Sequence, residues 1–265
     1  MVMLDNIANS EGAQKTTRDA FLGGKIEILQ PSGKGHRAGL DAILIAASLP
    51  QKISGTVADL GSGSGIAGLA SIALRPDLKT MLVENNPLMA QLAFQTSKLA
   101  KNSALSARIH VLEADVTLSG AKRESAGLIT NSCDYVILNP PYNDRGSNRA
   151  SSDLMRADAH LMGEGGLDAW MRTATSILKP RGMLVMIYRS QSIGQIIAAT
   201  QGRFGGLTIM PIYSRANEPA KRLLIRATKG SKAPIIFAPA LIVHNNDGSF
   251  TPEADAVLKG TAFLF

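Results

Sequence analysis

The chain has little of what disulfide scaffolds, cysteine-rich metal sites and membrane spans are made from. Its only cysteine is Cys133, so disulfides within the chain and zinc sites built from several cysteines are excluded. The longest apolar runs, such as residues 42–49, are far too short to cross a bilayer. The start of the chain shows no basic segment followed by an apolar one. We therefore expect a cytoplasmic protein that contacts no membrane.

Acidic residues and clustered histidines are also scarce. The chain has 28 Lys and Arg against 21 Asp and Glu, which gives a net charge of +7 and favours a polyanionic partner such as nucleic acid. Its four histidines are scattered along the sequence, so they indicate structural or solvated side chains: His36, His110, His160 and His244. Without a Cys/His cluster we expect no metal site.

What the chain does contain is an alternation of strand-like and helix-like segments. We expect strands at residues 25–30, 56–60, 80–83, 108–112, 134–138 and 183–188, and helices at 41–48, 66–73, 87–101, 166–178 and 192–201. This alternation predicts an α/β fold with a doubly wound, mainly parallel sheet. Further strands with short connections, at 207–212, 222–228 and 235–243, predict antiparallel additions at the C-terminal end.

A glycine-rich loop follows the strand at 56–60 and reads D-L-G-S-G-S-G from Asp59 to Gly65. Glycines at Gly61, Gly63 and Gly65 let the backbone turn tightly and approach a ligand closely. The sequence from Gly63 also matches the dinucleotide pattern G-x-G-x-x-G, but that match begins inside the loop and not at the strand end. A nicotinamide-dependent oxidoreductase is therefore disfavoured.

Acidic residues follow the next two strands. Glu84, with Asn85 after it, stands 25 positions beyond Asp59, where doubly wound folds place an acid against a ribose. Asp115 and Val116 follow the third strand, and the Asp115 carboxylate can accept from an adenine amino group. Because ligands bind outside the carboxyl ends of the strands of such sheets, these residues predict one common site.

The fourth strand is followed by Asn139-Pro140-Pro141-Tyr142. Two consecutive prolines end the strand and hold the backbone extended, because each ring fixes φ and removes an N–H. The Asn139 side chain and the Pro140 carbonyl are then fixed acceptors, with the Tyr142 ring beside them. This arrangement suits a planar group with an exocyclic NH2, either an adenine or a carboxamide.

Together these motifs resemble class I S-adenosylmethionine-dependent methyltransferases of the small-domain group, which carry NPPY. Residues 35–44 and 254–265 are similar to the bacterial valine-tRNA (adenine-N6) methyltransferases. The resemblance implies a seven-stranded Rossmann-like sheet and S-adenosylmethionine as cofactor, with S-adenosylhomocysteine as product. It implies cofactor contacts from the following residues: Arg37, Asp41, Asp59, Gly61, Gly63, Gly65, Glu84, Asn85, Asp115, Val116 and Asn139. Asn139 and Pro140 would hold the target amine, and Tyr142 would stack on the base.

An RNA substrate, which we expect to be a tRNA, requires basic residues near the site. The candidates lie after the NPPY motif and before the strand at 222–228: Arg145, Arg149, Arg156, Lys221 and Arg222. We expect a monomer or weak homodimer.

The domain organisation follows from these assignments. Residues 1–20 are polar and aperiodic and predict a flexible lead-in, and residues 21–265 form one methyltransferase domain. Within it, 21–50 are a strand–helix extension, 51–190 the cofactor-binding and catalytic core, and 191–265 the strands that complete the sheet.

Four other functions stay open at this point. A glutamine N5-methyltransferase of a release factor would use NPPY equally well, but such enzymes carry a helical domain that the first 35 residues do not suggest. Methylation of another base, such as a guanine in ribosomal RNA, is an alternative of similar weight. A methyltransferase fold that binds RNA without catalysis is opposed by the intact Asp59, Glu84 and Asn139. The shifted glycine pattern makes an oxidoreductase the weakest alternative.

Overall fold

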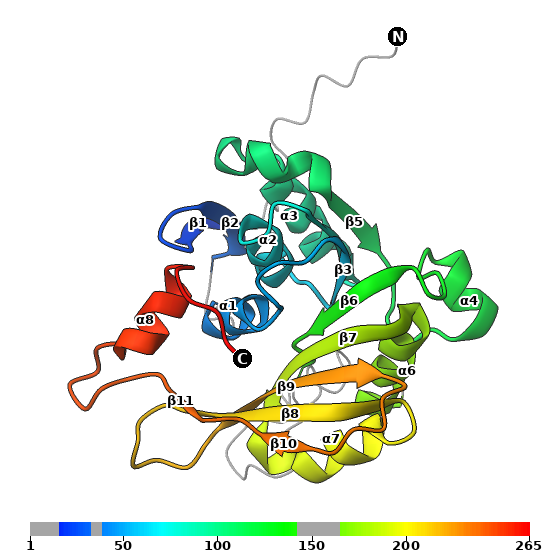
Figure 1. The fold of residues 1–265 in the computed structure, drawn as a ribbon. Coiled ribbons are helices and arrows are strands. Elements are labelled where there is room, and N and C mark those ends of the chain that lie inside the picture. Colours follow the sequence, from blue (N-terminus) through cyan, green and yellow to red (C-terminus); the bar gives the residue numbers. More distant parts are fainter. Residues whose placement is uncertain (1–15, 33–38, 142–164) are drawn as a thin grey trace, which may run out of the picture.

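The computed structural model describes residues 16–32, 39–141 and 165–265, and Figure 1 shows a large sheet with helices on both faces. The strands are β1 (Thr16–Phe21), β2 (Ile26–Pro31), β3 (Gly55–Leu60), β4 (Leu78–Glu84), β5 (Ile109–Glu113), β6 (Cys133–Leu138), β7 (Leu178–Arg189), β8 (Phe204–Tyr213), β9 (Arg222–Lys229), β10 (Ile236–Phe237) and β11 (Leu241–Ile242). The α-helices are α1 (Leu40–Ala47), α2 (Ile66–Ala73), α3 (Pro87–Ser97), α4 (Gly120–Ser125), α6 (Gly166–Ile177), α7 (Ile193–Thr200) and α8 (Pro252–Leu258). Two 3₁₀ helices complete the set, η1 (Ala100–Arg108) and η2 (Ser190–Ser192).

The sheet order is β10-β8-β9-β7-β6-β3-β4-β5, and β11 also pairs with β8. Strands β5, β4, β3, β6 and β7 are mutually parallel, and β9 runs antiparallel to both β7 and β8. The predicted doubly wound, mainly parallel sheet with seven main strands and antiparallel C-terminal strands is confirmed. The chain leaves β3 towards β4 and later returns to β6 on its other side, so the switch point of the sheet lies between β3 and β6.

One C-terminal strand differs from the expectation. Residues 235–243 form two strands of two residues each, β10 and β11, and both run parallel to β8. Pro239 stands between them, and because proline has no N–H to donate, it interrupts the ladder. The expected single strand at this position is therefore wrong.

Of the hairpin at the start of the described chain, only the second strand was predicted. Residues 16–20, assigned to the lead-in, belong to β1, which pairs antiparallel with β2. The turn between them has positive φ at Leu22, Gly23 and Gly24, and Gly24 N donates to Phe21 O at 3.1 Å. The two glycines adopt this backbone without strain, which explains why the chain reverses here.

The helix expected at 87–101 ends at Ser97, and η1 follows it. Fully buried Asn102 explains the change, because its side-chain amide fastens η1 to the hairpin. Its Nδ2 donates to Glu27 O at 2.6 Å and to Thr96 O at 2.8 Å, and its Oδ1 accepts from Glu27 N at 3.1 Å. These bonds join η1 to Glu27 of β2 and to Thr96 near the end of α3.

Two hydrophobic clusters fill the space between the sheet and its helices, one on each face. The first is built mainly from α1, α2, the β1–β2 hairpin and α8, and the second from α6, α7 and the opposite face of the strands. In Figure 1 the two groups of helices lie on opposite sides of the ribbon of strands. No helix in the described ranges is long and apolar enough to span a membrane.

Candidate active site

The carboxyl ends of the central strands are level with one another. Leu60, the last residue of β3, pairs with Val83 of β4 on one side and with Leu138 of β6 on the other. Glu84 at the end of β4 pairs in turn with Glu113 at the end of β5. The glycine loop, the acids after β4 and β5 and the Asn-Pro-Pro segment after β6 therefore start from one edge of the sheet.

The three glycines of the loop after β3 have left-handed backbone. Their φ angles are +70° at Gly61, +54° at Gly63 and +90° at Gly65, where residues with a Cβ are strained. Gly61 is also sterically closed, because a Cβ there would stand 2.5 Å from the Trp170 ring of α6. Gly63 has more space, since its nearest contact would be ordinary at 3.7 Å. A Cβ on Gly65 would stand 2.8 Å from Leu82. The loop thus needs glycine for its backbone at all three positions, and for packing at Gly61 and Gly65 but not at Gly63.

Hydrogen bonds tie this loop to β4. The amides of Gly61 and Ser62 both donate to Val83 O at 2.9 Å, and Gly63 N donates to Glu84 Oε2 at 2.8 Å. Glu84 thus holds the loop through its side chain as well as through its strand. A carboxylate oxygen has room for a second donor, so this contact leaves Glu84 able to accept from a ligand hydroxyl.

The other Glu84 oxygen organises the start of α3. Oε1 accepts from Asn86 N at 2.9 Å, and Asn86 Oδ1 caps the helix by accepting from Leu88 N at 3.0 Å and Met89 N at 3.3 Å. Asn85, between the two, is exposed. Asn86 was not among the predicted functional residues, although an Asn directly before Pro87 is a recognisable helix start.

Asp59 is the most buried acid of this edge, with 3 % of its surface exposed. Its Oδ2 accepts from Gly68 N of α2 at 2.8 Å. Burial raises its pKa from 3.8 to about 7, against the Gly68 bond, which lowers it, and with the negative charge of Glu84, which adds to the rise. One carboxylate oxygen of Asp59 thus faces α2, and a ligand contact from this residue stays a prediction.

Asp115 and Val116 form the turn after β5. Asp115 Oδ1 accepts from the Thr117 amide at 2.8 Å and from the Thr117 hydroxyl at 2.7 Å. Val116 is buried, and its carbonyl accepts from Thr173 Oγ1 of α6 at 2.6 Å. The turn is therefore fixed from within and by α6, so Val116 can present a rigid apolar surface beside the site.

Asn139 and Pro140 follow β6 directly, next to the switch point of the sheet. Asn139 is half-buried and Pro140 is buried, so a ring of fixed φ sets the backbone right after the strand. Several predicted site residues lie outside the described residues: Arg37, Tyr142, Arg145, Arg149 and Arg156.

The predicted RNA-contacting residues Lys221 and Arg222 are both engaged in ion pairs. Arg222 Nε lies 2.6 Å from Oδ2 of Asp41, whose side chain is only 12 % exposed. Lys221 Nζ lies 3.5 Å from Glu218, which also pairs with Arg215 at 3.2 Å. The structure thus joins a predicted cofactor residue, Asp41, to a predicted RNA residue over 181 positions of sequence. No local pattern signals this pairing.

Sequence reasoning also missed two residues of the loop's surroundings. Trp170 is 3 % exposed and packs where a Gly61 side chain would stand. Ser62 Oγ is buried and has no hydrogen-bond partner among the residues that the structure describes. A buried hydroxyl without a partner, in a glycine loop at the switch-point edge of the sheet, fits a bound polar cofactor. Within the same described ranges, no group of three His, Cys, Asp or Glu residues could hold a metal ion.

The fold is of the doubly wound class, with the candidate site at the switch-point edge of its sheet, and the comparisons place this fold among methyltransferases. The methyltransferase small domain family matches residues 37–204. A protein named tRNA1(Val) (adenine(37)-N6)-methyltransferase from Proteus mirabilis is 25% identical over 226 residues, which cover 82% of this chain and 83% of that protein.

Solved structures extend the comparison. A predicted O-methyltransferase from Agrobacterium tumefaciens has a TM-score of 0.73 and 38% identity, with 84% of this chain and 98% of that chain covered. TYW2 of M. jannaschii, in complex with AdoMet, has a TM-score of 0.54 and 12% identity over 83% of this chain and 88% of that chain, which indicates the shared fold.

The chain belongs to the methyltransferase small domain family. By family and fold the protein is an S-adenosylmethionine-dependent methyltransferase.

Proposed function

We propose that the protein methylates the exocyclic amine of an adenine in tRNA, next to the anticodon. The observation that carries this proposal is the position of Asn139 and Pro140. They follow β6 at the switch point, level with the glycine loop after β3. The residues proposed to hold the target amine and the loop proposed to hold the cofactor thus start from neighbouring strands.

The cofactor would lie along the edge from β3 to β5. Gly61, Gly63 and Gly65 would pass close to its methionine part, with Asp59 behind them and residues 37–41 closing over that end. Glu84, with Asn85 beside it, would accept from the ribose hydroxyls while it keeps its bond to Gly63. Asp115 and Val116 would contact the adenine ring. When bound, S-adenosylmethionine supplies a methyl carbon that the adjacent sulfonium makes strongly electrophilic.

The protein's catalytic task is then to position and polarise the amine. An exocyclic amine is a weak nucleophile, because its lone pair is delocalised into the ring. Asn139 Oδ1 and the Pro140 carbonyl would accept hydrogen bonds from its two N–H groups and so favour the positive charge that develops on nitrogen. Stacking by Tyr142 would hold the ring, so that nitrogen and methyl are aligned without a nucleophilic side chain or a metal.

Two observations favour tRNA as the substrate. The net charge of +7 suits a polyanion. Among similar proteins, those from Proteus mirabilis and Porphyromonas gingivalis are both named as valine-tRNA adenine methyltransferases. The predicted basic residues would then contact phosphates, with the target base turned out of the anticodon loop.

An oxygen acceptor is the second candidate, because the solved relative at 38% identity is described as a predicted O-methyltransferase. The site favours nitrogen over oxygen. Asn139 and Pro140 provide two acceptors, which match the two protons of an NH2 group, whereas a hydroxyl has only one proton to donate. The glutamine and ribosomal RNA alternatives also offer an NH2 group to both acceptors. Only identification of the methylated substrate therefore separates them from an adenine in tRNA.

Transfer of a labelled methyl group separates these candidates. The protein is incubated with labelled S-adenosylmethionine and, in parallel, with unmodified tRNA, unmodified ribosomal RNA or a release factor. We expect label in tRNA, in an adenine, and in neither of the other substrates. Label in glutamine, in ribosomal RNA or on an oxygen would replace the proposed substrate with the matching alternative.

A further inference from the structure

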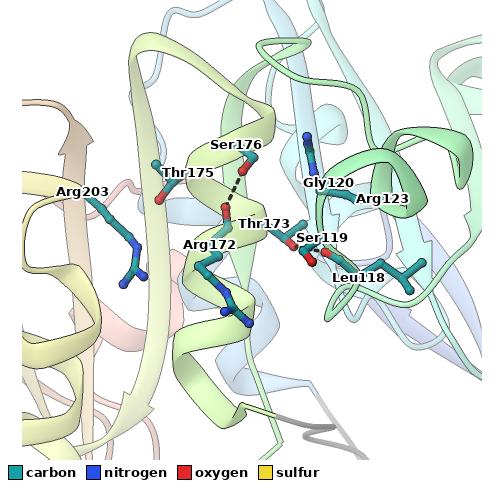
Figure 2. Close-up of a pocket in the computed structure, with 9 residues that line it drawn as sticks. All are labelled: Leu118, Ser119, Gly120, Arg123, Arg172, Thr173, Thr175, Ser176 and Arg203. Atoms are coloured by element: carbon teal, nitrogen blue, oxygen red, sulfur yellow. Dashed lines mark hydrogen bonds between the residues drawn. The ribbon is translucent and has the colours of Figure 1, made fainter.

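A hollow of about 370 Å³ lies on the outer face of α6, away from the residues assigned to catalysis. Figure 2 shows α6 with the turn at Leu118, Ser119 and Gly120 on one side and Arg203, from the turn between α7 and β8, on the other. The hollow is lined by three arginines and by several hydroxyl groups. Such a lining is typical of a site for an oxyanion.

Two of these arginines are held by one carboxylate. Arg203 Nη1 lies 2.7 Å from Oδ1 of Asp168, and Arg172 Nε lies 3.7 Å from Oδ2 of the same residue. The pair therefore carries two positive charges against one negative charge. Asp168 brings together two guanidinium groups that would otherwise repel each other, and it leaves a net positive charge on the surface of the hollow.

Both guanidinium groups keep donors for a ligand. Each has five N–H groups, and Arg203 Nη1 serves only Asp168 and Ala199 O, at 2.8 Å. The remaining N–H groups of Arg172 and Arg203 have no partner among the residues that the structure describes. Arg172 is 49 % exposed and Arg203 26 %, so both are accessible.

The third arginine differs from these two. Arg123 has only 7 % of its side chain exposed and is bonded to Leu128 O and Thr130 Oγ1, both at 2.8 Å, and to Glu124 at 3.3 Å. It is a structural support for the wall of the hollow. The ligand-facing charge therefore comes from Arg172 and Arg203.

The hollow is connected to the methyl-transfer edge through α6. The Thr173 hydroxyl contacts Val116 O at 2.6 Å and Leu118 O at 3.3 Å, which links the lining turn to the predicted adenine end of the cofactor site. Arg172 Nη2 lies 3.4 Å from where a Cβ on Gly165, the residue before α6, would stand. Arg172 thus reaches back along α6 towards the residue before its first turn.

We propose that Arg172 and Arg203 bind a phosphodiester group of the RNA substrate, at a contact separate from the target-base site. The proposal rests on the proposed function, since it takes RNA as the substrate. A guanidinium can donate hydrogen bonds to two phosphate oxygens at once. The hollow is open to solvent, so it can admit a phosphodiester that is part of a longer RNA backbone. The contact positions the RNA and takes no part in methyl transfer.

The test is RNA binding by Arg172→Ala and by the double variant Arg172→Ala/Arg203→Ala. The probe is a fluorescently labelled, unmodified tRNA transcript, followed by anisotropy at several salt concentrations. For the double variant we expect a Kd increased on the order of fivefold and a slope of log Kd against log salt that is shallower by about one. Because Arg203 also caps α7, Arg172→Ala alone provides a variant that leaves this cap intact, and it should show roughly half the effect on log Kd.

The matched control is Lys52→Ala/Lys79→Ala, which removes the same charge from exposed positions at the amino ends of β3 and β4. Equal effects of the two double variants would overturn the proposal, because general charge would then explain the loss. If the Arg172→Ala/Arg203→Ala variant binds tRNA with an unchanged Kd, and wild type methylates that tRNA, the proposed phosphate contact is wrong while the proposed function stands. If wild type binds no RNA, the proposed function falls as well.

Discussion

The cofactor half and the RNA half of the candidate site are held in different ways. In the cofactor half, neighbouring segments bond to one another: Glu84 holds the amides of Gly63 and Asn86, and Asp59 holds that of Gly68. In the RNA half, charged side chains form ion pairs, some local, as Lys221 with Glu218, and some across long stretches of chain, as Arg222 with Asp41. The first half is fixed by backbone amides, and the second by ion pairs between side chains of very different exposure, from the 12 % of Asp41 to the 61 % of Lys221.

This difference has a functional consequence. Because the glycine loop is already bonded to its neighbouring strand, it loses little conformational entropy when the cofactor binds. An RNA backbone requires charges that can adjust, and half-exposed arginines such as Arg172 retain that freedom. We therefore expect mutations in the cofactor half to affect stability and turnover, and mutations in the RNA half to affect RNA affinity and its salt dependence.

The largest expected effect comes from Asn139→Ala, at the boundary between the halves. Loss of one acceptor for the amine should reduce turnover by roughly 100- to 1000-fold, while cofactor affinity changes little. Initial rates at saturating substrates and cofactor binding by calorimetry measure the two quantities. Asn217→Ala, the same truncation at an exposed position, is the control. Undiminished turnover would refute the acceptor role.

A second comparison is made within the glycine loop. Gly61→Ala places a Cβ 2.5 Å from Trp170 and imposes strain at φ +70°, so we expect it to cost about 3 kcal/mol of unfolding free energy. Gly63→Ala has strain but an ordinary contact at 3.7 Å, and should cost about 1 kcal/mol. Urea denaturation of both variants gives the difference. Equal costs would mean that the Trp170 contact does not restrict this position.

The raised pKa of Asp59 predicts a pH dependence of stability. Its folded pKa of about 7 exceeds the ordinary value of 3.8, so between these values the folded state binds more protons than the unfolded state. The destabilising effect of Asp59 is therefore absent below about pH 4, increases up to about pH 7, and is complete above it. Relative to Asp59→Asn, wild type should lose on the order of 2 kcal/mol between pH 5 and 8. Parallel stability curves for the two proteins would contradict the assigned pKa.

The smallest expected effect concerns the ion pairs of the RNA half. A double-mutant cycle on Asp41 and Arg222, whose atoms lie 2.6 Å apart, should give a coupling energy of about 1 kcal/mol. The more exposed pair of Lys221 and Glu218, at 3.5 Å, should give nearly none. Thermal or urea unfolding of the single and double alanine variants measures both cycles. A larger coupling for the second pair would reverse our ranking of these contacts.

The sequence predicted the parts of the molecule that local patterns determine. Asp59 to Gly65, Glu84 and Asn139 each lie at or directly after the end of a strand, and parallel pairing brings strand ends to one edge, as observed. Residues whose role depends on distant partners could not be predicted. Trp170 acquires its place under Gly61 from the packing of α6, and Asn102 interrupts a helix because β2 lies beside it. Arg222 was assigned to RNA from charge alone, and its Asp41 partner is visible only in the folded chain.

The measurement that tests the central claim most directly is nucleoside analysis of a tRNA methylated by this protein. An unmodified transcript of a valine tRNA is incubated with S-adenosylmethionine and wild type or Asn139→Ala, digested to nucleosides and analysed by mass spectrometry. We predict N6-methyladenosine from the position beside the anticodon with wild type, and almost none with the variant. Methylation of another base or atom by wild type, or equal N6-methyladenosine from both proteins, would contradict the account.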